Sequence, residues 1–139
     1  MARREIILPH PPSVNTYWRH RIVAAKGKPA FVSVYVSEQG KQFREEVEKI
    51  AEPIPKEQRI IGNGTLLRCH VLWFPKDARE RDPDNICKGL LDSIKHAGFI
   101  RNDSDIWWLL VDRQCVSAPP GRVVVRLWPW NIRTWEEAA

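Results

Sequence analysis

The feature that most constrains the fold is an alternating segment at residues 65–74. Leu67, Cys69, Val71 and Trp73 are apolar, whereas the residues between the first three of them, Arg68 and His70, are polar. Successive side chains of a β-strand point to opposite faces, so this pattern predicts a strand with one buried face. Such a face needs a second layer of structure to cover it.

The following amphipathic segment can provide that layer. It begins near Asn85, after the charged loop PKDARERDPD, and its apolar residues recur at the spacing of one helical face. Gly98 stands where the residue after a helix end is commonly found. The apolar positions of this predicted helix are Ile86, Cys87, Leu90, Leu91, Ile94 and Ala97.

The remaining segments complete a pattern of strands and helices. We expect a strand at residues 5–8, a helix at 37–51 with Ser37 as its N-cap, and strands at 106–116 and 122–128. The turn-forming sequence SAPPG predicts that the last two strands form a hairpin, and residues 59–61 could pair briefly as a strand. The order β-α-β-α-β-β predicts an α+β fold, a single two-layer domain whose mixed β-sheet is covered by two main helices.

The length and composition agree with one domain spanning residues 1–139. A hydrophobic fraction of 43% is sufficient for a packed core, and no apolar run approaches the roughly 20 residues that span a bilayer. The N-terminal sequence MARREIILPHPPS lacks the uninterrupted apolar region of a signal peptide, so we expect a cytoplasmic protein without membrane contact. The three cysteines form no zinc-ligand spacing and are expected to be reduced thiols.

The positive charge is concentrated near the N-terminus. Residues 1–30 contain six Lys or Arg residues and one acidic residue, whereas the rest of the chain carries sixteen of each sign. Residues 13–33 show no clear periodicity and are interpreted as a long basic loop. Its cations, Arg19, Arg21, Lys26 and Lys28, are suited to a nucleic-acid backbone, although a solvated loop without a partner would have the same composition.

The chemically informative segment is Arg81-Asp82-Pro83-Asp84-Asn85. Pro83 keeps Asp82 out of the helical region, and alternate residues of an extended chain share a side, so both carboxylates can face one point. Adjacent hard oxygen ligands are what Mg²⁺ requires, with Mn²⁺ as a substitute. The alternative is that Asp84 is a simple helix N-cap, and an isolated pair of this kind is weak evidence.

Two further residues extend this candidate site. Asp103 lies just beyond the second predicted helix, and it could act in the site of its own subunit or in that of a partner subunit. Lys88 lies one turn beyond Asp84, away from the apolar stripe, where it could contact a phosphate. The alternatives are an Asx turn at Asp103 and an ordinary helix-surface ion pair for Lys88.

Other functional classes fit the sequence less well. Position six counted from Asp82 is Cys87 and position twelve is Ser93, so the segment is not an EF-hand. A nucleotide-sugar transferase would be expected to have a glycine-rich phosphate loop, which is lacking, and no nucleotide cofactor is expected. A non-catalytic DNA-binding accessory protein remains an alternative, but it has no need of three carboxylates near DNA.

Three segments in the same order resemble the RusA family of Holliday junction resolvases. They are LPHPPSVNTYWRH, RDPDNICKGLLDSIKHAGFIRNDSDI and RVVVRLW, and the resemblance covers residues 6–128. It implies that Asp82, Asp84 and Asp103 bind the catalytic metal with the assistance of Lys88. It also implies a homodimer that cuts four-way DNA junctions with paired, symmetric nicks. The residues assigned to DNA contact are Arg81, Lys88, Asn15, Tyr17, Arg19, Arg21, Lys26 and Lys28.

The chain also departs from the family pattern. Ala78 and Glu80 make the loop before Asp82 less arginine-rich, which predicts weaker or more salt-sensitive DNA binding. Asp105 is an additional carboxylate that is not placed among the metal ligands. The pair Trp107-Trp108 and the segment 129–139 have no assigned role. The expected chemistry is hydrolysis of a phosphodiester bond, with one or two metal ions.

Overall fold

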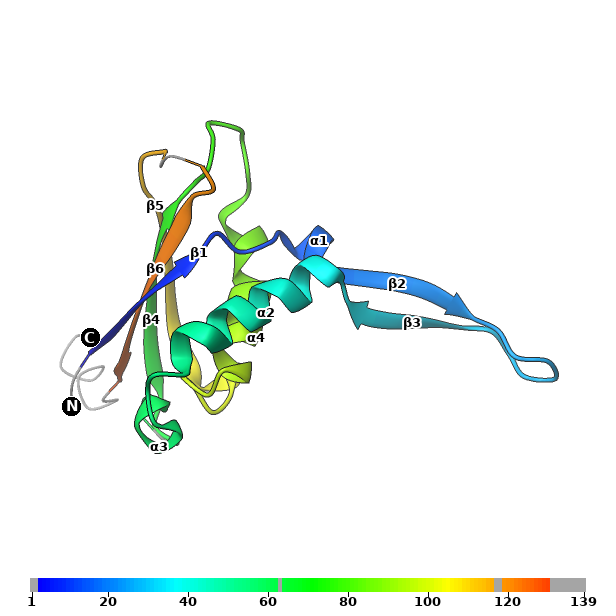
Figure 1. Ribbon diagram of the computed structural model, residues 1–139, viewed down its shortest axis with the longest axis horizontal. Helices are drawn as coiled ribbons and strands as arrows, with labels where there is room; N and C mark the ends of the chain where they lie inside the picture. The colour runs from blue at the N-terminus through cyan, green and yellow to red at the C-terminus, as the bar shows by residue number, and fades with distance from the viewer. Residues whose placement is uncertain (1–2, 63, 117–118, 131–139) are drawn as a thin grey trace, which may run out of the picture.

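A computed structural model shows a two-layer fold and describes residues 3–62, 64–116 and 119–130. The main sheet has the strand order β1-β6-β4-β5, and helices α2 and α4 cover one of its faces (Figure 1). The strands of this sheet are β1 (Arg4–Pro9), β4 (Leu67–Phe74), β5 (Ile106–Arg113) and β6 (Arg122–Pro129). The helices are α1 (Val14–Tyr17), α2 (Glu38–Ala51), α3 (Lys56–Arg59) and α4 (Cys87–His96), with 3-10 turns η1 (Pro83–Ile86) and η2 (Asp103–Asp105). The predicted α+β class with a mixed sheet is confirmed.

The core lies between the sheet and the two long helices. Leu67, Cys69, Val71 and Trp73 are at most 1% exposed, which confirms the alternation read from the sequence. They belong to one cluster with residues of both helices, including Phe43 and Val47 of α2 and Leu90 and Ile94 of α4. Full burial of one apolar side chain such as Leu or Val contributes roughly 1.5–3 kcal/mol, so the buried face of β4 helps to hold the two layers together.

Both long helices begin and end much as their sequences predict. Ser37 is the N-cap of α2, and its Oγ accepts a hydrogen bond from the Gly40 backbone N–H at 3.1 Å. The residue after α4 and its C-cap, Gly98, has a φ of +84°, a conformation that glycine adopts without strain. Ile50, near the C-terminal end of α2, is 39% exposed, because the buried stripe of that helix consists of Gly40, Phe43, Val47 and Ala51. No helix in the described part of the chain is long and apolar enough to cross a bilayer.

The last two strands do not form the predicted hairpin. β4 lies between them, parallel to β5 and antiparallel to β6. The burial of the two strands explains this arrangement: Val123, Val124 and Val125 are all buried, as expected for a central strand, whereas β5 is exposed along most of its length at an edge. Residues 119–120 lie in a turn, and residues 117–118 of the predicted turn lie outside the described residues.

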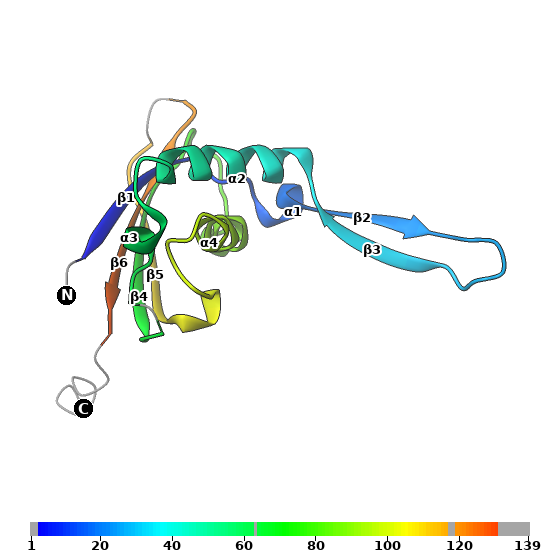
Figure 2. The ribbon, with the colours of Figure 1, turned by 60° about the horizontal axis from the view of Figure 1, so that its bottom comes forward.

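The predicted basic loop at residues 13–33 is in fact a short helix and a β-hairpin. After α1, β2 (Trp18–Val23) pairs with β3 (Phe31–Val36), and the hairpin projects away from the two layers in both views (Figures 1 and 2). β-branched and aromatic residues favour these strands, but both faces of the hairpin are largely exposed, so burial does not impose a regular polar–apolar alternation on both strands. Residues 59–61 do not form a strand either, since Arg59 ends the helical turn α3.

Candidate active site

The two carboxylates of the central segment lie where the chain enters α4. The parallel pairing of β4 with β5 requires a crossover, which is made by residues 75–82, η1 and α4. Asp82 is extended and occupies the N-cap position of η1, whereas Asp84 lies within η1, so Asp84 is not the N-cap. Both are exposed, and among the described residues neither side chain has a hydrogen bond or ion pair. Their charges are therefore free to attract a cation.

Asp103 folds back towards the start of the same helix. Its Oδ2 lies 3.6 Å from Nζ of Lys88, in the first turn of α4, and both side chains are partly exposed. A single subunit therefore brings Asp103 to the end of α4 that Asp82 and Asp84 precede. Lys88 pairs with Asp103 rather than with Asp84 or Asp92, the helix-surface partners that its spacing also allowed.

Asp105, two residues further on, has a different environment. Its carboxylate accepts hydrogen bonds from Arg101 Nε at 3.1 Å and from a terminal nitrogen of the same guanidinium at 2.8 Å. The residue is only 8% exposed. A buried carboxylate that is already bound in this bidentate way is occupied by its own arginine, which agrees with its exclusion from the predicted ligands.

The donor set at the start of α4 fits a hard divalent cation in chemical type. Asp82, Asp84 and Asp103 offer only carboxylate oxygens, the ligands that Mg²⁺ prefers. As the side chains stand, no group of three or more His, Cys, Asp or Glu residues within the described ranges is gathered closely enough to hold a metal ion. Asp82 and Asp84 are exposed and unpaired, so their rotamers can change without breaking an internal contact.

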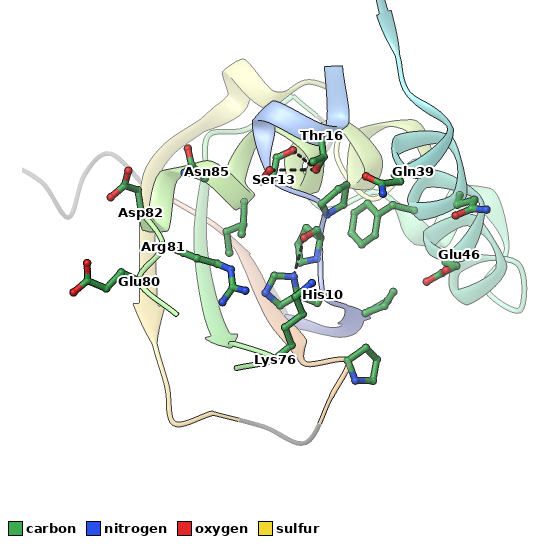
Figure 3. Close-up of a pocket in the computed structure, with 17 residues that line it drawn as sticks. His10, Ser13, Thr16, Gln39, Glu46, Lys76, Glu80, Arg81, Asp82 and Asn85 are labelled. Carbon is green, nitrogen blue, oxygen red and sulfur yellow. Dashed lines mark hydrogen bonds between the residues drawn. The ribbon is translucent and has the colours of Figure 1, made fainter. Parts of the chain in front are cut away.

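A cleft of about 760 Å³ opens beside Asp82. It is bounded by the proline-rich segment 9–16, the first half of α2 and the loop that precedes η1 (Figure 3). Arg81 points into this cleft towards His10 and Lys76, whereas Asp82 points away from them. The site therefore presents cations on one side of the loop and carboxylates on the other.

Arg81 is held in place by Asp77. Two guanidinium nitrogens of Arg81 donate to the Asp77 carboxylate at 2.6 and 2.9 Å, and these bonds hold the pKa of Asp77 well below its usual range. A phosphate bound to Arg81 would have to replace Asp77 or share the guanidinium with it. The sequence-based assignment of Arg81 to DNA contact did not anticipate this internal partner.

His10 is a cleft residue that the sequence did not single out. The indole N–H of Trp73 donates to its Nε2 at 2.9 Å, so Nδ1 carries the proton and donates to the Pro11 carbonyl at 2.8 Å. Burial lowers the pKa of His10, which favours the neutral ring. Both ring nitrogens are hydrogen-bonded within the protein, so this histidine holds the wall of the cleft in place. A lone histidine among prolines carries no recognisable pattern.

Tyr17 does not lie where a DNA-contacting residue must lie. It is completely buried; its hydroxyl donates to Asp92 and accepts from Arg44 Nε at 2.8 Å. Burial, reinforced by the hydrogen bond to Asp92, raises the pKa of Tyr17 to about 12. Tyr17 is therefore not accessible in this structure for the predicted contact with DNA, and it anchors the base of the hairpin instead.

The other predicted DNA-contact residues are accessible. Asn15 on α1 lines a second hollow together with Trp18 and Arg19 at the base of the hairpin. Arg19 and Arg21 are exposed on β2, and Lys26 and Lys28 are exposed in the turn that joins β2 to β3. The structure thus separates two groups of residues: carboxylates with Lys88 at the start of α4, and cations along a projecting hairpin.

The chain is similar to a family of known nucleases over most of its length. The family model described as "Endodeoxyribonuclease RusA" matches residues 9–127. A relative from Enterobacteria phage HK97, named crossover junction endodeoxyribonuclease rusA, is 37% identical over 127 residues, which cover 91% of this chain and 95% of the relative. The Escherichia coli K12 protein of the same name is 32% identical over 119 residues, covering 86% of each chain.

Proposed function

The chain belongs to the RusA family of endodeoxyribonucleases, and from this membership we propose that it is a metal-dependent nuclease that cuts Holliday junctions and other branched DNA. One structural observation supports this most strongly. Asp103 lies against Lys88 in the first turn of α4, which follows directly on Asp82 and Asp84. Carboxylates and a lysine at one helix end are the groups that phosphodiester hydrolysis needs.

Asp82, Asp84 and Asp103 would hold Mg²⁺, with Mn²⁺ as a substitute. When bound, the metal supplies Lewis-acid stabilisation of the phosphate and a bound water of lowered pKa. Lys88 would contact the phosphate or the leaving sugar oxygen; its present partner, Asp103, would be shared with the metal. The Lys and Arg side chains of the cleft, Lys76 and Arg81, would lie along the DNA backbone beside the cut.

The proposed working unit is a homodimer that makes paired, symmetric cuts. A four-way junction has two equivalent strands, and a two-fold dimer presents the same site twice. β5 supports this proposal because it is an edge strand with exposed apolar side chains, including Trp107, Leu109 and Leu110. An exposed apolar edge strand readily pairs with another chain.

A non-catalytic DNA-binding protein is the less favoured alternative. Exposed carboxylates without internal partners, such as Asp82 and Asp84, would repel phosphates unless a cation neutralised them. The deciding assay incubates an end-labelled four-way junction and a linear duplex of the same sequence with the protein and Mg²⁺. We expect symmetric nicks in the junction, an intact duplex and no cutting in EDTA. Binding of the junction without any cutting over Mg²⁺ and Mn²⁺ concentrations would support the alternative.

A further inference from the structure

The projecting hairpin has two chemically different faces. Residues directly opposite one another in an antiparallel pair share a face. Arg19 is paired with Tyr35, Arg21 with Ser33 and Val23 with Phe31, and these six residues form one face. Trp18, His20, Ile22, Val32, Val34 and Val36 form the other. We refer to them as the cationic–aromatic face and the aliphatic face.

The cationic–aromatic face exposes flat rings beside guanidinium groups. Phe31 is 60% exposed and Tyr35 41% exposed. The guanidinium carbon of Arg21 lies 5.4 Å from the centre of the Tyr35 ring, within the range of a cation–π interaction. Since residues 18–36 include four Lys or Arg residues and no Asp or Glu, nothing in the hairpin would repel an anion.

The aliphatic face exposes mainly aliphatic side chains and has no Lys or Arg. Ile22, Val32 and Val34 are 77%, 62% and 55% exposed, and they carry neither a charge nor a ring. His20 and, at the base, Trp18 are the ring-bearing members of this face. The two faces of the hairpin therefore can be compared directly, because their side chains are similarly exposed but point in opposite directions and differ in chemical type.

The base of the hairpin is fixed beside the candidate active site. Tyr17, the residue before β2, packs against Gly89, where a Cβ would lie 2.9 Å from its ring. Gly89 is the neighbour of Lys88 in α4. Arg44 and Asp92 bind the Tyr17 hydroxyl from α2 and α4, which ties the hairpin to both helices. The base of the hairpin is therefore held against the residue that follows Lys88 in α4.

We propose that the cationic–aromatic face is a stacking platform for unpaired bases of branched DNA, with Phe31 and Tyr35 as the stacking rings. Bases inside an intact duplex are covered on both sides by their neighbours, whereas bases at a branch point or in a flap can expose a π-face. Aromatic rings bind such bases without sequence preference, and nearby cations hold the backbone. This inference rests on the proposed function for its ligand, and it assigns a substrate feature to a surface outside the carboxylate site.

The test compares two double variants in metal-free buffer. F31L/Y35L removes both rings but keeps apolar side chains and all charges, and V32A/V34A is the matched control on the opposite face. Affinities are measured for a four-way junction, a thymidine flap and a linear duplex. We expect F31L/Y35L to weaken binding to the junction and flap about tenfold for each ring that stacks, and to leave duplex binding unchanged. The control should bind all three as the wild type does.

A second measurement detects the contact itself. 5-Iodouracil at the branch point or in the flap should crosslink on irradiation to a peptide containing Phe31 or Tyr35. An unchanged affinity of F31L/Y35L, an equal loss on the duplex, or a loss confined to V32A/V34A would overturn the platform; the last outcome would identify the aliphatic face as the contact. If the wild type fails to cut junctions but crosslinks through these rings, the nuclease proposal fails and the platform stands. If it cuts junctions and the rings have no effect, the platform alone fails.

Discussion

Two acidic residues of η2, Asp103 and Asp105, are separated by a single position yet have different environments. Asp103 faces Lys88 at 3.6 Å and is partly exposed, whereas Asp105 is buried and bound by Arg101. The same residue type can therefore serve a reaction at one position and the fold at the other. This contrast provides an internal control for the proposed metal site.

We expect asparagine at Asp82, Asp84 or Asp103 to reduce junction cutting by about two orders of magnitude or more. Each change replaces an anionic metal ligand with a neutral side chain of nearly the same shape. Cutting is measured in single-turnover reactions with Mg²⁺, and junction binding in EDTA. Binding and the thermal midpoint should remain close to those of the wild type, since none of these carboxylates fills the core. A variant that cuts at a near-normal rate would remove its residue from the site.

The matched control is Asp105→Asn. It breaks a bidentate ion pair that is only partly protected from water, so we expect a loss of about 1–2 kcal/mol in the free energy of unfolding. Its cutting rate per folded molecule should be unchanged. Loss of cutting in this variant without loss of folding would place Asp105, rather than Asp103, near the reaction.

At the scale of elements, a small polar network connects the base of the hairpin to helices α2 and α4. Tyr17, Arg44 and Asp92 come from α1, α2 and α4, and each bonds to the other two. Burial by itself would raise the pKa of Asp92, but the hydrogen bonds from Tyr17 and Arg44 outweigh it and lower that pKa below its ordinary value of 3.8. The network thus favours the ionised carboxylate in the folded protein.

The pH dependence follows from this lowered pKa. The folded state holds the Asp92 proton less tightly than the unfolded chain, so the stabilisation is complete above about pH 4 and is lost as the pH falls further. Arg44→Met should reduce the free energy of unfolding by about 2–3 kcal/mol at neutral pH, and by less below pH 4. Denaturant titrations at several pH values measure both effects. A constant difference between variant and wild type across this range would exclude Asp92 as the titrating partner.

The cations of the hairpin make a separate prediction about salt. If Arg19, Arg21, Lys26 and Lys28 contact phosphates, the logarithm of the binding constant should fall with the logarithm of salt concentration by about 0.9 per contact on duplex arms. Replacing all four by glutamine should flatten this slope. An unchanged slope would place the phosphate contacts elsewhere, with Lys76 and Arg81 in the cleft as the next group to test.

The elements that the sequence predicts best are those with one buried and one exposed face. β4 and the two long helices form where the sequence predicts them, because their regularly spaced apolar residues pack into the core. The hairpin has no buried face, and its strands show no such pattern, so residues 13–33 suggested a loop. The sequence also did not predict that β5 pairs with β4. A turn between β5 and β6 does not require these two strands to be neighbours in the sheet.

The candidate site shows the same division. Residue types and spacing, taken together with the resemblance to the RusA family, predicted Asp82, Asp84, Lys88 and Asp103 as one group. The sequence left open whether Asp103 reaches its own site, and only the folded chain places it beside Lys88. Tyr17 binds Asp92, 75 residues away in the chain, and sequence spacing does not reveal such a tertiary contact. Arg81 binds Asp77, four residues before it, and this local pair depends on how the loop folds rather than on a regular helical spacing.

At the scale of the whole molecule, the sheet has two edges of unequal character. β1 is short and carries Arg4 and Glu5, whereas β5 runs for eight residues and exposes Trp107, Leu109 and Leu110. Proteins usually protect a long apolar edge with charges, a bulge or a covering element. No element of the described part of the chain pairs with the outer side of β5. A second copy of the chain is the partner that the two-fold symmetry of a four-way junction suggests.

We therefore expect Trp107→Glu to convert a dimer into a monomer. The wild type should sediment at about twice the chain mass of 16.2 kDa at micromolar concentration, and the variant at that single mass. The matched control is Ile7→Glu, which places the same charge at a residue of similar exposure, 60% against 64%, on the opposite edge. The control should remain dimeric, whereas dissociation by Ile7→Glu alone would move the interface to β1.

The Trp107→Glu monomer should release junctions nicked on one strand, because the second cut then requires a separate binding event. A wild-type protein that is strictly monomeric and still makes coordinated nicks would contradict the dimer itself.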